Sequence, residues 1–374
     1  AEIEYADETS PSIYVNFKLN NIPAAFAEAG VDLERAYVLI WTTTPWTLPS
    51  NTAVSLGPDI DYCFVEADGK FMMFAKDMVE AVAKVAGWES YRIVEANGEP
   101  VTMKGDQFGD ITYICPVLHE NTGRIIWGEH VTLDAGTGAV HTAPGHGVDD
   151  YKVGMKFGVD TIMPIDDDGR FTDYVPQWAG LTTDEANPKI IEWLREQGTL
   201  VAHVDIVHSY PHCWRCATPL IYKPVSSWFV SVTKIKPRLL ELNQQINWIP
   251  ENVKDGQFGK WLANARDWSI SRNRFWGSPI PVWVSDDPKY PRVDVYGSLE
   301  ELKADFGDYP RDKDGNVNMH RPWIDNLTRV NPDDPTGKSH MHRISDVLDC
   351  WFESGSMSFA QFHYPFENKE KFEQ

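Results

Sequence analysis

AYVLIWTTTPWTLPSN, residues 36–51, runs from a β-branched and aromatic stretch into four threonines, two tryptophans and two prolines. Its first half, residues 36–43, has the composition of a β-strand. The threonine hydroxyls that follow can donate and accept hydrogen bonds without carrying charge. The prolines restrict the backbone just after the strand. This stretch therefore predicts a strand that ends in a rigid, uncharged polar wall.

A second unusual segment, GTGAVHTAPGHGVDDY, lies at residues 136–151. Its glycines predict tight turns and close approach by another group. It also contains His141, His146, Asp149 and Asp150. Taken alone it fits a strand–turn–helix junction with Asp149 near the helix N-terminus, or one side of a binding site. The glycine spacing matches neither GxGxxG nor GxxxxGK[ST], which disfavours dinucleotide and Walker-type phosphate sites.

Short strands and a few helices surround these two segments. Helical spacing indicates helices at 76–87, 151–158 and 186–198. A Ser-Pro pair at 10–11 predicts a break between two strands near the start of the chain. Over roughly residues 20–200 the pattern is typical of an α+β domain with a strongly curved or barrel-like mixed sheet. Segment 286–338, rich in Asp, Pro and Gly, predicts a long excursion of loops.

Charge and composition narrow the functional class. The chain has 374 residues and a net charge of −21, and residues 1–200 hold 13 Lys and Arg against 32 Asp and Glu. Such an acidic half is a poor general binder of phosphate backbone, so any nucleic-acid contact there must be local. The absence of a membrane-length apolar run or a signal-peptide pattern predicts a cytoplasmic protein without membrane contact. Five cysteines, an odd number, argue against a disulfide framework, and Cys63, Cys115 and Cys350 lie in apolar runs that predict buried positions.

Together, WTTTPWTLPSN and GTGAVHTAPGHGVDDY closely resemble the editing domain of the isoleucyl-tRNA synthetase family, in class I. Valyl and leucyl relatives have Arg-Pro where this chain has Thr44-Pro45. VDIVHSYPHCWRCATPLIY, DWSISRNRFWGSPIPVW and DVLDCWFESGS resemble the return of that family's chain into the catalytic core. The resemblance implies a lead-in over 1–20, an editing domain over 21–200, and a return segment over 201–374. The last would be an incomplete α/β segment of Rossmann type.

This resemblance implies hydrolysis of valine esters of tRNA(Ile), and of valyl-adenylate, by positioned water rather than by an enzyme nucleophile. Isoleucine and valine differ by one methylene, which a pocket distinguishes by only about 1–3 kcal/mol, and isoleucyl-tRNA synthetase is itself a standard example of that limit. Carried over by position, Asp150 would hold the α-ammonium group of the substrate. Thr43, with Thr42 and Thr44, would lie near the ester carbonyl and the terminal adenosine.

The same resemblance implies roles for further residues. Trp46, Asn51 and His141 would complete the walls, and His141 is also a candidate acid or base. If the match to the family's motif is shifted by one residue, Asp149 would bind the ammonium group of the substrate instead of Asp150. Trp351 would line the isoleucine pocket of the synthetic site. The 3′ end of tRNA(Ile) and the rest of the synthetase chain are the implied partners.

The cofactor predictions follow from what the sequence lacks. Cys213-Trp-Arg-Cys216 has the spacing of half a zinc knuckle, but no second cysteine pair precedes DVLD. We therefore predict no metal site, with Cys213 and Cys216 as the candidates if zinc binds. Editing is expected to need no cofactor. ATP with Mg²⁺ belongs to the complete ligase, whose HIGH and KMSKS motifs are missing here, so we expect no aminoacylation by this piece alone.

Two alternatives to an editing hydrolase remain open at this point. The chain could bind tRNA or an aminoacyl-adenylate without turnover, or it could be a zinc-stabilised interaction module based on the CWRC sequence.

Overall fold

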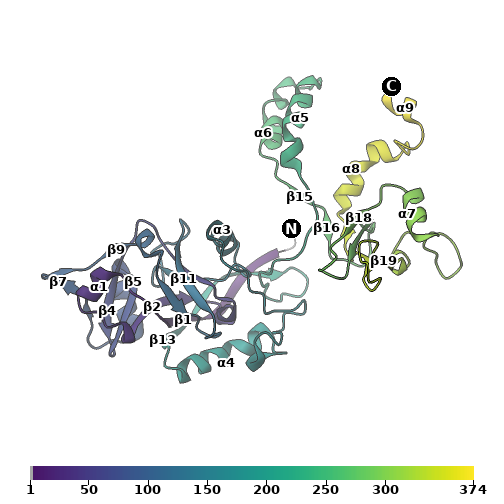
Figure 1. The fold of residues 1–374 in the computed structure, drawn as a ribbon. Helices are drawn as coiled ribbons and strands as arrows, with labels where there is room; N and C mark the ends of the chain where they lie inside the picture. Colours follow the sequence, from purple (N-terminus) through teal and green to yellow (C-terminus); the bar gives the residue numbers. More distant parts are fainter. Residues whose placement is uncertain (1–2) are drawn as a thin grey trace. The chain divides into compact units, whose positions relative to one another are not determined.

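The computed structural model describes residues 3–374 and has a mixed α/β architecture, which confirms the predicted combination of helices and strands (Figure 1). The chain divides into two compact units, Ala1–Pro224 and Val225–Gln374, which we call unit 1 and unit 2. Within residues 3–374, no helix is both long and apolar enough to cross a membrane. The functional segments predicted at 1–20, 21–200 and 201–374 stay predictions.

Unit 1 is built around an 11-stranded sheet that mixes parallel and antiparallel pairs. Its strands are β1 (Ile3–Lys18), β2 (Ala36–Thr42), β3 (Ala53–Leu56), β4 (Asp61–Ala67), β5 (Lys70–Ala75), β6 (Arg92–Ile93), β9 (Met103–Lys104), β10 (Thr112–Ile114), β11 (Thr122–Trp127), β12 (Ala139–Thr142) and β13 (Leu200–Cys213). A separate small pair is formed by β7 (Glu95–Ala96) and β8 (Glu99–Pro100). Strand β12 lies between β2 and β3, parallel to the first and antiparallel to the second.

The sheet of unit 1 closes on itself in the order β1-β2-β12-β3-β11-β10. The closing link is a bridge between Leu19, just after β1, and Tyr113 of β10. Beside it, the backbone N–H of Asn20 donates to the carbonyl of Thr112 at 2.9 Å. The rings of Phe17 and Tyr113, whose centroids are 5.4 Å apart, pack within the apolar core. The closed sheet thus forms a rigid frame that can fix side chains at its strand ends.

Strand β1 is a single long strand, so the predicted break at Ser10-Pro11 is wrong. It pairs antiparallel with β13 from Ile3 opposite Cys213 to Val15 opposite Leu200. Pro11 is tolerated because β2 borders β1 only from Ile13 onward. One edge of β1 at Pro11 therefore has no neighbouring strand that needs its missing N–H.

The helices of unit 1 cover the sheet and connect its strands. They are α1 (Ala24–Glu28), α2 (Val79–Ala86), α3 (Val148–Phe157) and α4 (Thr183–Glu196), with 3₁₀ helices η1 (Leu33–Arg35), η2 (Pro45–Ser50), η3 (Lys76–Met78), η4 (Gly105–Phe108) and η5 (Pro176–Trp178). All three predicted helices are present. Helix α4 begins earlier than predicted because Thr182 and Glu185 form a capping box. It packs against η2 and contacts β1 and β13 (Figure 1).

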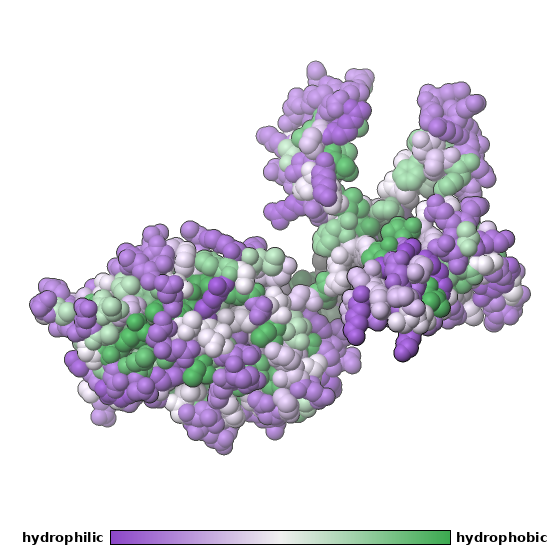
Figure 2. All heavy atoms as spheres, in the orientation of Figure 1, coloured by the Kyte–Doolittle hydropathy of each residue, from purple (hydrophilic) through white to green (hydrophobic). Residues whose placement is uncertain are grey.

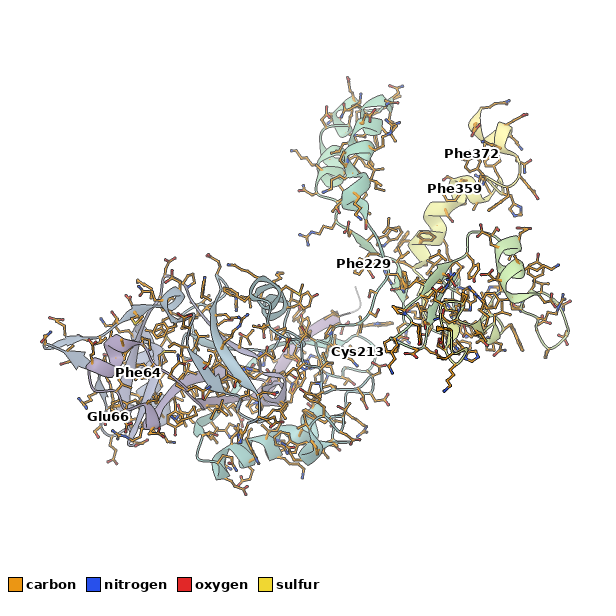
Figure 3. All side chains as sticks on the ribbon, in the orientation of Figure 1. Phe64, Glu66, Cys213, Phe229, Phe359 and Phe372 are labelled. Atoms are coloured by element: carbon orange, nitrogen blue, oxygen red, sulfur yellow. The ribbon has the colours of Figure 1, made fainter. Side chains whose placement is uncertain are left out.

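Strand β4 is buried along most of its length. Phe64 is fully buried in the core, whereas Glu66, two residues along, binds Arg92 at 2.6 Å (Figure 3). Both Cys63 and Cys115 are buried, as predicted.

Unit 2 contains smaller sheets and five helices. The strands are β14 (Phe229–Val230), β15 (Trp268–Ser269), β16 (Ser271–Arg272), β17 (Val282–Ser285), β18 (Val293–Val295), β19 (Arg329–Val330), β20 (His340–Arg343) and β21 (Val347–Leu348). The helices are α5 (Val232–Gln245), α6 (Gln257–Ala263), α7 (Leu299–Phe306), α8 (Cys350–Ala360) and α9 (Lys369–Glu373), with 3₁₀ helices η6 (Glu251–Val253) and η7 (Ile324–Asn326). The strand pairs described in this unit are antiparallel, so they do not form the parallel pairs of a Rossmann-type sheet.

The predicted excursion of loops at 286–338 is wrong in part. Strands β18 and β19 belong to a four-stranded sheet in the order β18-β17-β20-β19, and α7 lies between them in sequence. This region has its own core of Trp283, Tyr296, Leu302, Ile324 and Met341.

Apolar residues are exposed on unit 2, as its hydropathy shows (Figure 2). Phe229 on β14 is 58% exposed, and Trp351 on α8 is 72% exposed. Phe359 and Phe372 lie on the C-terminal helices (Figure 3). Cys350 is exposed rather than buried as predicted, because it opens α8 and few residues cover that helix.

Candidate functional site

The threonines that follow β2 are tied together by their own hydroxyl groups. Thr42 ends the strand, and its Oγ1 accepts from the backbone N–H of Thr44 at 3.1 Å. Thr44 precedes Pro45, which opens η2, and Thr47 Oγ1 donates back to the carbonyl of Thr44 at 2.8 Å. Proline suits the first helical position because that N–H needs no partner. The predicted polar wall is therefore a strand end folded back into a short helix.

Strand β12 brings His141 against this wall. Its Nε2 lies 2.9 Å from Thr47 Oγ1, and its Nδ1 lies 2.8 Å from Asn51 Nδ2. The Asn51 amide is oriented by two further bonds, because Oδ1 accepts from Tyr113 and Nδ2 donates to the carbonyl of Ala53. Asn51 therefore donates to Nδ1 of His141, and Nε2 carries the hydrogen that points to Thr47.

Burial keeps His141 neutral. Its side chain is 6% exposed, and this desolvation, helped by neighbouring His146, lowers its pKa to about 3. Both ring nitrogens are occupied by protein partners. This arrangement favours the wall role over the acid–base role that the sequence left open.

Helix α3 supplies the carboxylate. Asp150 lies in its first turn, and its Oδ2 accepts from the backbone N–H of Ala143 at 2.8 Å. Val153 anchors the helix in an apolar cluster with Ala53 of β3 and Ile126 of β11. Residues three apart lie on one helix face, so this anchor also fixes Asp150. Desolvation by burial raises the pKa of Asp150.

These elements enclose a cavity of about 250 Å³. It is lined by hydroxyl, imidazole and carboxylate groups together with small and aromatic side chains: Trp41, Thr42, Thr43, Thr44, Thr47, His130, Thr132, Ala135, Thr137, Gly138, Ala139, Val140, His141, Ala143, His146 and Asp150. Five of the predicted site residues meet here, namely Thr42, Thr43, Thr44, His141 and Asp150.

Two predicted wall residues lie just behind the cavity. Asn51 is 1% exposed and supports His141 from the rear. Trp46 is 5% exposed, its backbone N–H donates to Asn187 Oδ1 of α4 at 3.0 Å, and it lines a neighbouring cavity of about 450 Å³. Thr43 and Thr44 line both cavities, so they form a partition between them.

Two other predicted residues are not brought to the cavity. The side chain of Asp149 is 61% exposed and pairs with Lys152 at 3.0 Å. Trp351 belongs to unit 2 and is exposed on α8. Neither residue lines the cavity of unit 1.

Three lining residues were missed in the sequence, namely His130, Thr132 and Thr137. His130 and Thr132 belong to GEHVTLDA, directly before the second segment, and Thr137 lies within that segment. A local signal was present at Gly136, whose φ of +78° and contact with the Trp41 ring exclude a side chain. Such a glycine indicates that the preceding loop approaches the wall closely.

The cysteine pair lies at the end of β13. Cys213 ends that strand (Figure 3), and Cys216 Sγ lies 3.2 Å from Thr218 Oγ1. Hydrogen bonding by Thr218 lowers the pKa of Cys216 to about 7. Over residues 3–374, no group of three or more His, Cys, Asp and Glu side chains is placed to hold a metal ion.

The buried imidazole predicts an acid-sensitive fold. The pKa of His141 falls from its ordinary 6.5 to about 3 on folding, so between these values the unfolded chain binds the extra proton. Stability is therefore lost as pH falls through this window, by up to about 1.4 kcal/mol per pH unit from this group. Urea unfolding at several pH values should show a shallower pH slope for His141→Gln than for the wild type. The exposed His119→Gln should retain the wild-type slope, and equal slopes for all three proteins would contradict the prediction.

Comparison with known proteins adds sequence relatives. A family model described as tRNA synthetases class I (I, L, M and V) matches residues 1–374. The isoleucine–tRNA ligase of Bifidobacterium longum is 61% identical over 370 residues, covering 92% of this chain and 33% of the relative. The isoleucine–tRNA ligase of Nocardia farcinica is 52% identical over 347 residues, covering 91% of this chain and 32% of the relative. The isoleucine–tRNA ligase of Rickettsia prowazekii is 49% identical over 384 residues, covering 98% of this chain and 34% of the relative.

The chain thus spans about a third of the length of the curated relatives it matches. Among solved structures, a crystal structure of GlLeuRS-CP1 aligns with 50% of this chain and 96% of its own, at a TM-score of 0.38 and 16% identity.

Proposed function

The chain belongs to the class I tRNA synthetases of the I, L, M and V group, and from this premise we propose that unit 1 carries the editing site of an isoleucine–tRNA ligase. The resemblance seen in the motifs is confirmed by the isoleucine–tRNA ligase relatives. The proposed reaction is hydrolysis of valine esters at the 3′ end of tRNA(Ile), with valyl-adenylate as a second substrate. The observation that carries the proposal is the cavity in which Thr42, Thr43, Thr44 and Asp150 meet.

Asp150 is suited to bind the α-ammonium group of the substrate. Its Oδ2 is held by the Ala143 N–H, so the carboxylate has a fixed direction. Burial raises the pKa of Asp150 in the free protein. A cation at hydrogen-bond distance favours the charged carboxylate, so binding of an ammonium group offsets that desolvation. Esters without a free amine should therefore bind poorly.

The threonine wall is suited to the ester and its water. Thr43 and Thr44 line the cavity beside Thr42 and present hydroxyls without charge. In such a site catalysis rests on orienting the water and on polarising the carbonyl. His141 is neutral and fully engaged with Thr47 and Asn51, so it shapes the wall.

The size of the cavity fits a small acyl group. Its volume of about 250 Å³ lies below the roughly 300–1,000 Å³ typical of pockets for drug-sized ligands. The partition of Thr43 and Thr44 separates it from the larger neighbouring cavity. A cavity of this size has room for a valyl group, and isoleucine is longer by one methylene, which a pocket distinguishes by about 1–3 kcal/mol.

The proposed hydrolysis uses side chains and water. ATP and Mg²⁺ would serve the ligation reaction of the complete enzyme, with tRNA(Ile) and the remaining synthetase chain as partners in the cytoplasm.

Release of valine from valyl-tRNA(Ile) tests the function directly. The purified chain should release valine faster than the spontaneous rate and should leave isoleucyl-tRNA(Ile) intact. Binding of tRNA without release would support the alternative of an inert binding module. Stoichiometric zinc in the purified chain, held by Cys213 and Cys216, would support the interaction module instead.

The shared wall makes single threonines partly replaceable. We expect Thr43→Ala to reduce the valine release rate by about fivefold, equivalent to the ~1 kcal/mol of a single neutral hydrogen bond. Neighbouring Thr42 and Thr44 keep their hydroxyls in the same cavity. Single-turnover deacylation measures the rate, with Thr122→Ala on β11 as a matched control outside the cavity. Complete loss of activity in Thr43→Ala would assign the role to that hydroxyl alone.

A further inference from the structure

One polar side chain of the cavity is not used by the proposed mechanism. His130 lines the cavity beside Asp150. Its Nε2 is buried and, within residues 3–374, has no hydrogen-bond partner. By contrast, His141 and His146 each have protein partners at both ring nitrogens. His130 is thus the imidazole of this cavity with an unmet nitrogen.

A tight turn after β11 places this ring. Val131 N donates to the carbonyl of Gly128 at 3.3 Å, and Gly128 N donates to Leu56 of β3 at 2.9 Å. A Cβ on Gly128 would lie 2.5 Å from His130 Nδ1 and 3.4 Å from a methyl of Val153. The glycine therefore permits the ring to lie flat against its own turn, close to the helix that carries Asp150.

Leaving the nitrogen unpaired has a cost. A buried polar atom without a partner is destabilising, and native proteins seldom retain one without a functional reason. The positive form of His130 also acts electrostatically on both Asp149 and Asp150, which places the ring within range of the carboxylate. A half-turn about the Cβ–Cγ bond exchanges Nε2 with Cε1, so the ring can offer its nitrogen to a group that enters the cavity.

We propose that His130 binds the hydrolytic water of the editing reaction through its unpaired ring nitrogen and accepts a proton from it. The water oxygen forms a bond to the acyl carbon, and the bond from that carbon to the ribose oxygen breaks. The proton taken by His130 passes to the departing ribose oxygen, so the products are valine and a free 3′-terminal hydroxyl. This inference rests on the proposed editing function.

The chemistry of the other groups in the cavity supports His130 as the group that accepts the proton. His141 offers no free lone pair, since Asn51 donates to its Nδ1 and its Nε2 points to Thr47. Asp150 is assigned to the ammonium group. The threonine hydroxyls are weak bases, so an imidazole is the group with a suitable proton affinity near neutral pH.

Single-turnover deacylation of valyl-tRNA(Ile) tests the proposal. His130→Ala should slow release of valine by about 10²-fold or more, the usual contribution of a positioned acid or base. Added imidazole should restore part of the rate in this variant, which a purely structural role would not allow. His119→Ala is the control, since His119 contacts the carbonyl of Pro116 outside the cavity. An unchanged rate in His130→Ala, or a loss that imidazole does not relieve, would overturn the proposal.

A second measurement separates this inference from the editing function itself. An amide-linked valyl-adenosine resists hydrolysis and can be added to the wild type. Its binding should shift the imidazole resonances of His130 in an NMR spectrum and leave those of His119 unchanged. A wild type that binds the analogue but releases no valine would refute the editing function. Absence of a shift at His130 in the bound protein would refute the role of this residue alone.

Discussion

Replacing Asp150 with alanine is expected to reduce valine release from valyl-tRNA(Ile) to the spontaneous rate. The carboxylate is held by the Ala143 N–H in the cavity and is the group assigned to the substrate ammonium. Removing one partner of a buried charge pair costs about 2–5 kcal/mol, which corresponds to a loss of roughly 30-fold to several thousand-fold in rate. No other charged side chain assigned to the substrate lines the cavity, so we expect no compensation.

The design of this experiment separates charge from structure. Asp150→Asn retains an acceptor for the Ala143 N–H but removes the charge, so it should be folded and equally inactive. Circular dichroism checks the fold of both variants. Asp149→Ala tests the alternative register, because Asp149 is exposed and paired with Lys152. If Asp149→Ala loses activity while Asp150→Ala remains active, Asp149 rather than Asp150 binds the ammonium group of the substrate.

The second large effect is expected on stability. Asn51→Ala should lower the free energy of unfolding of unit 1 by about 3 kcal/mol or more, since several buried groups lose their partner at once. Tyr113 donates to Oδ1 of Asn51 at 2.7 Å, and Nδ2 of Asn51 donates to the carbonyl of Ala53 and to Nδ1 of His141. Each of these residues is at most 6% exposed.

Urea unfolding monitored by far-UV circular dichroism measures this loss. A matched control is Asn21→Ala, whose amide bonds to Asp110 and Thr112 at an exposed site. It should cost clearly less than Asn51→Ala. Equal losses for the two variants would show that the buried network contributes no more than a surface amide.

The strand and wall of the site could be predicted from the sequence, but the contacts across them could not. The composition of residues 36–51 is a local property and correctly indicated where β2 ends. The bond between Thr47 and His141 joins residues 94 positions apart. It depends on β12 entering between β2 and β3, and the local periodicity of a strand does not specify its neighbours.

The misses have similar physical causes. His130 carries no motif, and its place depends on a close approach that Gly128 allows. Helix α7 was overlooked among Asp, Pro and Gly residues, although Ser298 followed three positions later by Glu301 is a helix-start signal. Ser10-Pro11 was read as a break because the pairing of β1 with β13, about 200 residues away in sequence, was not visible locally.

The antiparallel ribbon of β1 and β13 has a mechanical consequence. Ile3 lies opposite Cys213, so the two polypeptide strands that lead away from the closed sheet leave it side by side. Paired Cα atoms in such a ribbon are only about 4.5–5.5 Å apart. A domain with such closely spaced ends can be inserted between two adjacent positions of another fold without moving those positions apart.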